Sequence, residues 1–240
     1  MLSVIVTTHN TSAYIDECIE SILASTTSDF EVIVVDDGST DDTQTKLQRW
    51  SDRDDRVCVD YRDHQGRRAA LVRAHQLAAG EALCWVDSDD RVHPDAFARS
   101  LATIDDEHQL VWTQRTPIDS AGRPRGDDRR NRIPYRPDQL LVDNMIFHLR
   151  TFTAELFATA GGIGDLESAI DWDMNLRMVE HTTPKHIPRR LYDYRIRTGR
   201  MGGTISQHLN GRIAVERAVA RRGLPYRLVT NRTGWHIAKR

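Results

Sequence analysis

The sequence contains the stretch Leu83-Cys84-Trp85-Val86-Asp87-Ser88-Asp89-Asp90, in which an apolar run becomes acidic without an intervening turn residue. The apolar part has the length of a buried strand in a parallel sheet. Because side chains alternate along a strand, Asp87 and Asp89 can point the same way at its carboxyl end. Neighbouring carboxylates repel each other unless a cation lies between them, and oxygen ligands of this kind suit Mg²⁺ or Mn²⁺. An acidic turn that binds nothing is the alternative interpretation.

Strand and helix patterns alternate on the amino-terminal side of this stretch. The expected elements are a strand at 2–8, a helix with apolar positions 15, 19, 22 and 23, a strand at 30–35, a polar helix to about 50, a weaker strand at 56–61 and a helix at 66–79. This alternation predicts an α/β fold, with a mostly parallel sheet and helices on both faces. Right-handed crossovers place the acidic ends of the strands, Asp36-Asp37 and Asp87–Asp90, along one edge. Ligands of open α/β sheets bind at that edge.

Two common nucleotide-binding motifs are absent from the sequence. No G-x-G-x-x-G follows the first predicted strand, and no G-x-x-x-x-G-K-[ST] occurs anywhere. A dinucleotide-binding domain and a P-loop NTPase are therefore both disfavoured. What remains is a nucleotide site built from carboxylates and a metal ion.

Three amino-terminal segments resemble the signatures of family 2 glycosyltransferases. They are residues 4–10 (Val-Ile-Val-Thr-Thr-His-Asn), 34–43 (Val-Val-Asp-Asp-Gly-Ser-Thr-Asp-Asp-Thr) and 79–90, which ends in the acidic stretch above. The resemblance continues with residues 161–163 (Gly-Gly-Ile), 171–178 (Asp-Trp-Asp-Met-Asn-Leu-Arg-Met) and 191–195 (Leu-Tyr-Asp-Tyr-Arg), and it covers residues 2 to about 200. It implies the GT-A fold, which is Rossmann-like, and an enzyme that binds a nucleotide-sugar with a divalent metal and transfers the sugar with inversion.

Length and charge fit this interpretation. A chain of 240 residues can form one good core with a trailing element. We expect a GT-A domain at 1–200, with a nucleotide-binding half at 1–110 and an acceptor half at 111–200, followed by a basic carboxyl-terminal helix and tail at 201–240. Residues 1–110 carry 22 acidic and 10 basic side chains, whereas residues 185–240 carry 2 and 14. The basic end is either a solvated tail or faces an anion, such as the diphosphate, an acidic acceptor or lipid headgroups.

The three cysteines and the apolar runs indicate the cellular setting. Cys18, Cys58 and Cys84 are expected to be reduced thiols of the core, because nothing in their spacing suggests a disulfide framework or a zinc site. No apolar run approaches 18 residues, and no secretory signal pattern opens the chain. We therefore expect a cytoplasmic protein. Contact of its basic end with the inner face of the membrane stays an open alternative.

The middle of the chain is less informative. Residues 111–113 are expected to form a strand, and 118–134 have the composition of a mobile loop, which is either a lid on the acceptor side or an ordinary surface insertion. Residues 144–152 are expected to return as a strand. His148 in that strand either faces the acceptor or is structural.

The resemblance assigns roles at the donor site. Asp89 matches the metal ligand of the family's D-x-D motif, and Asp87 beside it is expected to reach the ribose or a metal-bound water. Asp37 is expected to read the base edge, with Arg67 near the uracil ring. The residues expected to line the same pocket from the first turn are Thr7 and Asn10.

The catalytic base implied by the resemblance is Asp171. The family usually has Glu-Asp here, whereas this chain has Ile170 before the aspartate. Asp173 is expected to point elsewhere, as a helix-start charge that complements the helix dipole. Trp172 is interpreted either as an apolar wall against the sugar or acceptor, or as an ordinary core aromatic.

A second departure from the family lies near the end of the resemblance. After Tyr-Arg the family often carries a His two positions on that completes the metal shell, and this chain has Arg197 there. Arginine cannot bind a metal, but its guanidinium can hold phosphate oxygens. We therefore expect Arg195, Arg197 or Arg200 to take part of the diphosphate charge. A helix is expected from residue 206 to about 222.

Three functions stay open on the sequence alone. The first is an inverting glycosyltransferase of polysaccharide biosynthesis, transferring a hexosyl or N-acetylhexosaminyl group from a UDP-sugar to a carbohydrate, lipid-linked or other hydroxyl acceptor, with Mn²⁺ or Mg²⁺ as cofactor. The second is a metal-dependent nucleotidyltransferase, for which residues 7–10 lack the expected glycine- and lysine-bearing loop. The third is a degenerate family member that binds a nucleotide or sugar without transfer. No nucleic-acid partner is expected.

Overall fold

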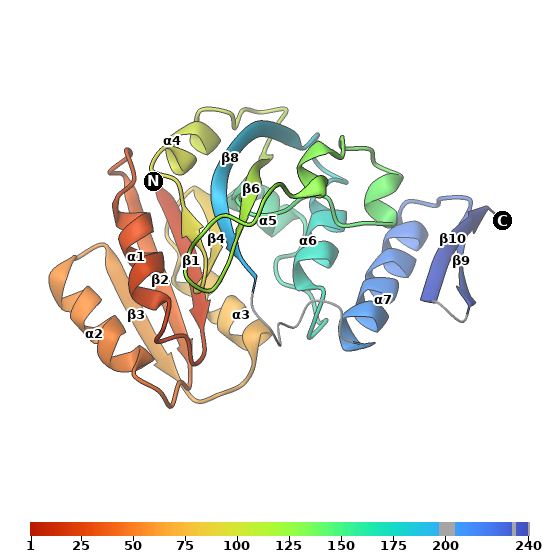
Figure 1. Cartoon of the computed structure of the whole chain (residues 1–240). Coiled ribbons are helices and arrows are strands. Elements are labelled where there is room, and N and C mark those ends of the chain that lie inside the picture. The colour runs from red at the N-terminus through yellow and green to blue at the C-terminus, as the bar shows by residue number, and fades with distance from the viewer. Residues whose placement is uncertain (197–204, 232–233, 240) are drawn as a thin grey trace.

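The computed structural model describes residues 1–196, 205–231 and 234–239 (Figure 1). Its amino-terminal half follows the predicted alternation closely, because β-branched and apolar runs form the strands and the segments between them form the helices. In chain order the elements of this half are β1 Leu2–Thr8, α1 Ile15–Leu23, β2 Phe30–Asp37, α2 Thr43–Arg53, β3 Val57–Arg62, α3 Arg67–Leu77, β4 Ala82–Asp87, β5 Arg91–Val92 and α4 Ala96–Leu101.

The second half adds strands to the same sheet and helices around it. Its elements are β6 Leu110–Ile118, η1 Arg129–Arg132, η2 Gln139–Leu141, β7 Arg150–Thr153, α5 Ala154–Thr159, α6 Ile170–Met178, β8 Lys185–Arg195, α7 Ile205–Arg221, β9 Tyr226–Asn231 and β10 Gly234–Lys239. The strand predicted at 144–152 was wrong in its first six residues, since β7 begins only at Arg150.

One sheet carries the strands β1 to β8 in the order β3-β2-β1-β4-β7-β6-β8-β5. The pairs β2–β3, β1–β2, β1–β4 and β6–β8 are parallel, whereas β7 runs antiparallel to both β4 and β6, and β5 runs antiparallel to β8. The mostly parallel sheet expected from the sequence is therefore confirmed. The reversed β7 brings the second half of the chain against the strand that ends in Asp87.

Alternation along the strands divides the core into two layers. On β4, Cys84 and Val86 belong to the apolar cluster that includes Ile15, Ile19 and Leu47 of α1 and α2. Leu83 and Trp85 belong to the other cluster, which includes apolar residues of α3, α5, α6 and α7. Helices therefore cover both faces of the sheet, as predicted. Cys18 and Cys84 are buried, but Cys58 is exposed, which corrects its prediction as a core thiol.

The carboxyl-terminal extension is a helix followed by a hairpin. Helix α7 buries Ala214, Val215, Ala218 and Val219 in the cluster on the α3 side of the sheet, and together with the hairpin β9–β10 it lies at the end of the molecule opposite β3 (Figure 1). The helix was predicted, but the antiparallel pair β9–β10 that follows it was not. Within the described residues no helix is long and apolar enough to cross a membrane.

Candidate functional site

The carboxyl ends of β1, β2 and β4 lie side by side, so the predicted donor residues meet at one edge of the sheet. Thr7 pairs in register with Asp87 on one side and with Val35 on the other. Thr8 is level with Asp36. This adjacency follows from parallel pairing, because strands that run the same way end at the same edge.

The acidic turn 87–90 is clamped by strand β8. Tyr192 Oη accepts a hydrogen bond from the Asp87 backbone N–H at 3.1 Å and donates to Asp90 Oδ2 at 2.8 Å. The backbone N–H of Arg195 donates to Asp90 Oδ1 at 2.7 Å, and Arg195 Nε donates to the carbonyl oxygen of Asp89 at 2.6 Å. Asp90 therefore has a structural role, and β8 sets the conformation of the turn that carries Asp89.

Arg195 differs from its prediction as a diphosphate ligand. Its side chain is only 1% exposed, and its guanidinium also donates to the carbonyl oxygens of Asp119 and Ser120 and pairs with Glu17. The segment after β6, predicted to be mobile, is thus tied to the acidic turn through this arginine. Arg197 and Arg200 lie outside the described residues.

Asp87 sits between two side chains from different elements. Arg67, the first residue of α3, donates from Nη2 to Asp87 Oδ1 at 2.7 Å. His148 Nε2 lies 3.3 Å from Asp87 Oδ2, and its ring stacks on Tyr192 with centroids 5.1 Å apart. Burial lowers the pKa of His148 to about 3, although the Asp87 carboxylate opposes this shift. His148 is therefore a neutral, buried neighbour of Asp87, positioned by the loop before β7 and not by a strand.

Asp171 is the second residue of helix α6, near the Asp87 group, and its side chain is 36% exposed. Its Oδ2 accepts hydrogen bonds from Asn144 Nδ2 and from Arg150 Nη1, both at 3.1 Å. Burial would raise the pKa of Asp171, but the charges of Arg150 and Arg67 outweigh burial and hold it below its ordinary value. Asp171 is thus an ionised carboxylate that shares its electrostatic surroundings with the Asp87 group.

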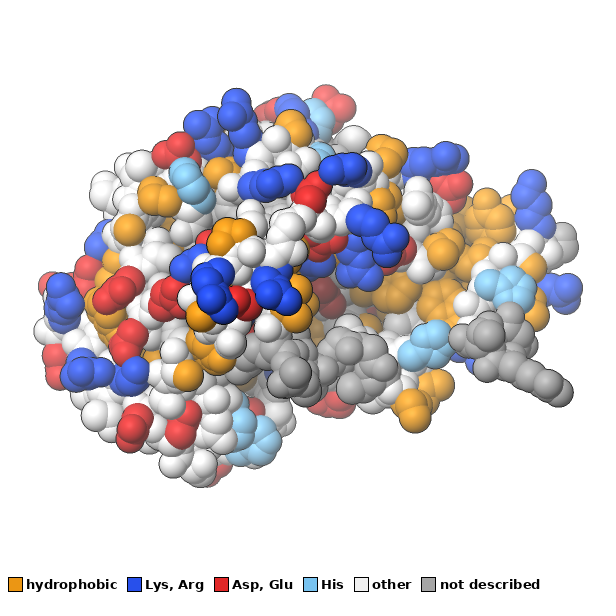
Figure 2. All heavy atoms as spheres, viewed as in Figure 1, with side chains coloured by type: hydrophobic (Ala, Val, Ile, Leu, Met, Phe, Trp, Pro, Cys, Tyr) orange, Lys and Arg blue, Asp and Glu red, His pale blue; other side chains and the backbone are white. Residues whose placement is uncertain are grey.

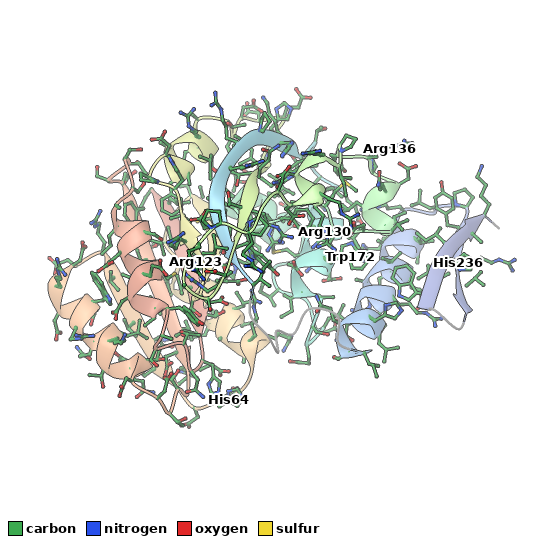
Figure 3. The ribbon with its side chains drawn as sticks, viewed as in Figure 1. His64, Arg123, Arg130, Arg136, Trp172 and His236 are labelled. Carbon is green, nitrogen blue, oxygen red and sulfur yellow. The ribbon has the colours of Figure 1, made fainter. Side chains whose placement is uncertain are left out.

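The two residues that follow Asp171, Trp172 and Asp173, have their contacts away from Asp87 and its partners. Trp172 Nε1 donates to the carbonyl oxygen of Leu140, and its ring stacks on Trp235 of the hairpin at 6.0 Å. Figure 3 shows Trp172 beside α6 and well apart from His64. Asp173 is 2% exposed and pairs with Arg177 at 2.9 Å. Of the two interpretations of Trp172 the structure favours packing. Asp173 lies in the first turn of α6, as expected, and it is buried there in an ion pair with Arg177.

The end of β2 forms a second polar group. Asp37 is 5% exposed, and its carboxylate accepts from the backbone N–H of Gln65 at 2.8 Å and of Gly66 at 2.9 Å. The rings of His9 and His64 stack at 4.3 Å, and both Nδ1 atoms lie close to the Asp37 carbonyl oxygen, at 2.7 and 3.0 Å. Asp37 therefore orders the loop that leads into Arg67, the residue expected to share the base with it.

Asn10 orders the neighbouring turn. Its Oδ1 accepts from the backbone N–H groups of Thr40 at 2.8 Å and Asp41 at 3.3 Å, and its φ of 54° lies in the left-handed region that asparagine tolerates. Its side-chain oxygen thus holds the turn after β2, beside the predicted base pocket.

Two sets of residues could hold a metal ion. His9, Asp37 and His64 place ligand atoms within 4.8 Å of one another, in the one such group found among the described residues. The acidic turn offers carboxylate oxygens, and Asp89 within it is 4% exposed. The bonds to described residues that shape this turn fall on the carboxylates of Asp87 and Asp90 and on the carbonyl of Asp89. Because Mg²⁺ and Mn²⁺ prefer oxygen ligands, the acidic turn fits them better than the two imidazoles do.

The structure brings the charged side chains of Asp87, Arg67 and Asp171 and the neutral ring of His148 into one network, together with a residue that sequence reasoning missed. Arg150 is only 1% exposed and links this network to the core. The available signal was an arginine within the mostly apolar segment from Met145 to Phe152, which His148 and Thr151 also interrupt. Asn144 was missed as well, since an exposed-looking asparagine at the edge of a loop carries no such signal.

Comparisons with known proteins bear on this arrangement. The model of the glycosyl transferase family 2 matches residues 3–159. The chain is 32% identical over 196 residues to a chondroitin synthase of Escherichia coli, covering 80% of this chain and 28% of that protein. It is 27% identical over 196 residues to a hyaluronan synthase of Pasteurella multocida, covering 80% of this chain and 20% of that protein. The chain therefore spans less than a third of either relative.

Solved structures share the fold. TarS of S. aureus in complex with UDP-GlcNAc superposes with a TM-score of 0.75 at 20% identity, covering 91% of this chain and 65% of that one. The mannosyltransferase PcManGT from Pyrobaculum calidifontis, in complex with GDP-Man and Mn²⁺, superposes with a TM-score of 0.65 at 20% identity, covering 92% of this chain and 63% of that one. The curled, mostly parallel sheet with flanking helices thus resembles that of GT-A glycosyltransferases.

Proposed function

The chain belongs to the glycosyl transferase family 2, and from this premise we propose that it transfers a sugar from a nucleoside-diphosphate donor to an acceptor hydroxyl with inversion at the anomeric carbon. The observation that carries the proposal is the ionised Asp171 carboxylate, which lies in one charged network with Asp87 at the edge where the acidic turn ends. Direct displacement needs these two parts, one to deprotonate the acceptor and one to stabilise the departing diphosphate.

Asp171 is the proposed general base. Its side chain is partly exposed, and its lowered pKa keeps it ready to accept a proton at neutral pH. A positioned base of this kind contributes about 10²–10⁴-fold to the rate. Inversion requires the base on the face of the sugar opposite the leaving group, and Asp171 comes from α6 while the acidic turn comes from β4.

Asp89 would hold a divalent cation, Mn²⁺ or Mg²⁺, which supplies a Lewis acid for the departing diphosphate when bound. Asp87 pairs with Arg67 and lies beside His148, and we propose that it accepts a hydrogen bond from the ribose or from a metal-bound water. Asp37 and Arg67 are proposed to read the base, which favours UDP. TarS binds UDP-GlcNAc and PcManGT binds GDP-Man with Mn²⁺, so both donor types occur among the structures with this fold.

The acceptor is proposed to be a carbohydrate. The relatives named chondroitin synthase and hyaluronan synthase point to polysaccharide synthesis and to a hexosyl or N-acetylhexosaminyl group. A binding module without transfer is the second candidate, favoured by Ile170 in place of the family's glutamate. The ionised, partly exposed Asp171 favours the enzyme.

A thermal-shift screen tests the donor proposal. UDP, GDP and dTDP are added with and without Mn²⁺, and UDP with Mn²⁺ should raise the unfolding midpoint most. A ligand at 100 times its dissociation constant stabilises the folded state by about 2.7 kcal/mol. Hydrolysis of UDP-N-acetylglucosamine in the presence of Mn²⁺ then separates the enzyme from a binding module. No shift with any nucleotide would overturn the donor proposal, and binding without turnover would favour the binding module.

A further inference from the structure

Arg150 is a buried charge that needs a partner. It is the first residue of β7, its side chain is 1% exposed, and its guanidinium lies 5.5 Å from the centre of the Trp85 ring. Removing a charge from water is costly unless it is paired and hydrogen-bonded. Nη1 donates to Asp171 Oδ2 at 3.1 Å and to the carbonyl oxygen of Ile146 at 3.2 Å. Nε and Nη2 have no hydrogen-bond partner among the described residues. Asp171 is therefore the one carboxylate with which Arg150 forms an ion pair in the described part of the chain.

The same oxygen of Asp171 is held from a second side. Asn144 Nδ2 donates to Oδ2 at 3.1 Å, and Asn144 is itself fixed because its Oδ1 accepts from Asn175 Nδ2 at 2.9 Å. Asn175 Nδ2 also donates to the carbonyl oxygen of Ile146 at 3.1 Å, the same carbonyl that Arg150 binds. Two donors thus share Oδ2, while about a third of the Asp171 side chain stays accessible.

We propose that Arg150 is a positioning residue for the base: together with Asn144 it binds Oδ2 of Asp171 and thereby presents Oδ1 to the acceptor hydroxyl. The inference rests on the proposed transferase function. In the reaction the acceptor O–H bond breaks, its proton passes to Oδ1, and the acceptor oxygen bonds to the anomeric carbon as the diphosphate leaves with its electron pair. Position 170, a carboxylate in much of the family, is here Ile170, which is 7% exposed and lies in the core cluster. This chain therefore holds its base with a buried arginine.

The charges around Asp171 give the proposal a measurable signature. The groups that face it are Arg150 of β7, Arg67 of α3 and His148 of the preceding loop, and Asp87 contacts the last two. Burial alone would raise the pKa of Asp171, and Arg150 contributes the largest opposing effect. Removal of the Arg150 charge should therefore raise the pKa of Asp171, and the acidic limb of the rate profile should move to higher pH.

The test compares Arg150→Met with Arg150→Lys and Asn144→Ala. The Asp171 carboxyl is followed by ¹³C NMR, its resonance assigned by its loss in Asp171→Asn, and the rate is followed by Mn²⁺-dependent hydrolysis of UDP-N-acetylglucosamine. In Arg150→Met the titration midpoint of Asp171 should rise by at least about one pH unit, the acidic limb should move with it, and turnover should fall about ten- to hundredfold. Arg150→Lys should restore the midpoint without restoring full turnover, because lysine keeps the charge but not the planar fork.

Arg177→Met is the matched control. Arg177 is also largely buried and pairs with an aspartate of α6, but that partner is Asp173, which faces away from the site. The Arg177→Met variant should unfold at a lower temperature, but the titration midpoint of Asp171 should be the same as in the wild type. If Arg150→Met does not fold, Arg150→Lys and Asn144→Ala decide the question, since both should lower turnover at unchanged UDP affinity. An Asp171 titration or a turnover that is the same in the Arg150 and Asn144 variants as in the wild type would overturn the proposal. Wild-type protein that binds no nucleotide would overturn the proposed function instead, and the titration would still decide the Arg150–Asp171 pairing.

Discussion

At the scale of single residues, Asp171 and Asp173 show how two carboxylates on one helix acquire different tasks. Asp171 is partly exposed and hydrogen-bonded through one oxygen, whereas Asp173 is 2% exposed and paired with Arg177. An ionised carboxylate can accept a proton only where substrate can reach it. Exposure and partner, and not position on the helix, therefore separate the proposed base from a structural ion pair.

Asp171→Asn should lower turnover by about 10²–10⁴-fold and leave donor affinity unchanged, because proton transfer occurs only on the way to the transition state. Asp173→Asn should do the reverse, lowering the free energy of unfolding by about 1–3 kcal/mol at near-normal turnover. Initial rates, calorimetric UDP affinity and urea unfolding of both variants check this. Comparable losses of turnover in the two variants would place the base elsewhere.

Asp89→Ala should abolish the Mn²⁺-dependent part of UDP binding, because it removes the proposed cation ligand from the acidic turn. Isothermal titration calorimetry of UDP with and without Mn²⁺ measures this. Asp106→Ala, at an exposed position away from the turn, is the control and should bind as the wild type does. Retained Mn²⁺ dependence in Asp89→Ala would point to another ligand set, such as His9, Asp37 and His64.

Arg67→Ala should weaken UDP binding while the dependence on Mn²⁺ persists, because it removes a proposed base contact and the partner of Asp87 at 2.7 Å. The neighbouring Arg68→Ala is the control, since Arg68 Nε donates to the carbonyl oxygen of Gly164. Equilibrium titration with UDP measures both. Equal affinities in the two variants would show that the base lies elsewhere.

Sequence reasoning points to carboxylates that stand at the ends of predicted elements, and it misses side chains whose surroundings depend on tertiary contacts. Asp87, Asp89 and Asp171 stand at predicted element ends, where carboxylates are conspicuous. Arg195 has the right charge for a diphosphate ligand, yet it is buried against carbonyl oxygens of Asp89 and Asp119. Its partners lie 76 and 106 positions away, and no local pattern shows them.

At the scale of elements, strand β8 determines the shape of the acidic turn at the end of β4. The hydroxyl of Tyr192 joins the Asp87 N–H to Asp90 Oδ2; the bond to Asp90 is buried and the bond from Asp87 is partly buried. A buried donor or acceptor left without its partner costs more than the bond itself contributes. The contacts of β8 therefore contribute to the free energy of unfolding and also fix the turn that carries Asp89, the proposed cation ligand.

Tyr192→Phe should lower the free energy of unfolding by about 1–3 kcal/mol, because it leaves the Asp87 N–H and an Asp90 oxygen without this partner. It should also weaken Mn²⁺-dependent UDP binding. Tyr61→Phe removes a hydroxyl from a residue that is 40% exposed, and it should change neither quantity. Urea unfolding and calorimetry measure the two effects. A Tyr192→Phe protein as stable as the wild type would mean that the clamp carries little of the turn's energy.

The elements themselves were predictable where hydrophobic period and strand length agree, as in β1, β2, α1 and β4. The segment 118–134 was not, because its polar composition resembles that of a mobile loop. Its order comes from an ion pair between Arg115 and Asp128 at 2.6 Å and from the bonds of Arg195 to its first residues. The hairpin β9–β10 was missed although Asn231 and Gly234 are residue types common in turns, because its two short strands alternate polar and apolar residues only weakly.

At the scale of the whole molecule, the contrast in charge between the two ends is partly neutralised by folding. Arg217 pairs with Asp165, and Arg221 and Arg222 both pair with Glu180. Figure 2 shows Lys and Arg side chains interspersed with Asp and Glu over this face of the molecule. An anionic partner for the basic end therefore stays a prediction, with fewer available arginines than the sequence suggested.

Stability of the whole fold should fall in mild acid because of His75. Burial lowers the pKa of this core histidine to about 3, and its Nε2 accepts from Trp85 Nε1 at 2.9 Å. The unfolded chain binds a proton below about pH 6.5, whereas the folded protein does not, so stability present above pH 6.5 is lost as pH falls toward 3. Between these two pKa values the free energy of unfolding should fall by on the order of 1 kcal/mol for each unit by which the pH is lowered.

Urea unfolding between pH 7.5 and 4.5 measures this loss. His75→Phe should flatten the pH dependence, because phenylalanine can keep the stacking on Phe157 but takes up no proton. His181→Gln, at an exposed position, should leave it as in the wild type. An unchanged slope in His75→Phe would assign the acid sensitivity to other groups.

The clamp of β8 on the acidic turn also sets an order of events during synthesis. The bonded backbone of Arg195 and the carboxylate of Asp90 are 105 positions apart in the chain. A ribosome that adds about 5–20 residues per second delivers β1 to β4 several seconds before the clamp exists. In that interval the nascent sheet carries three neighbouring carboxylates whose arrangement nothing yet enforces. The proposed cation site is thus complete only after β8 has been made, and a nascent chain that still lacks β8 would compete poorly for the cell's manganese.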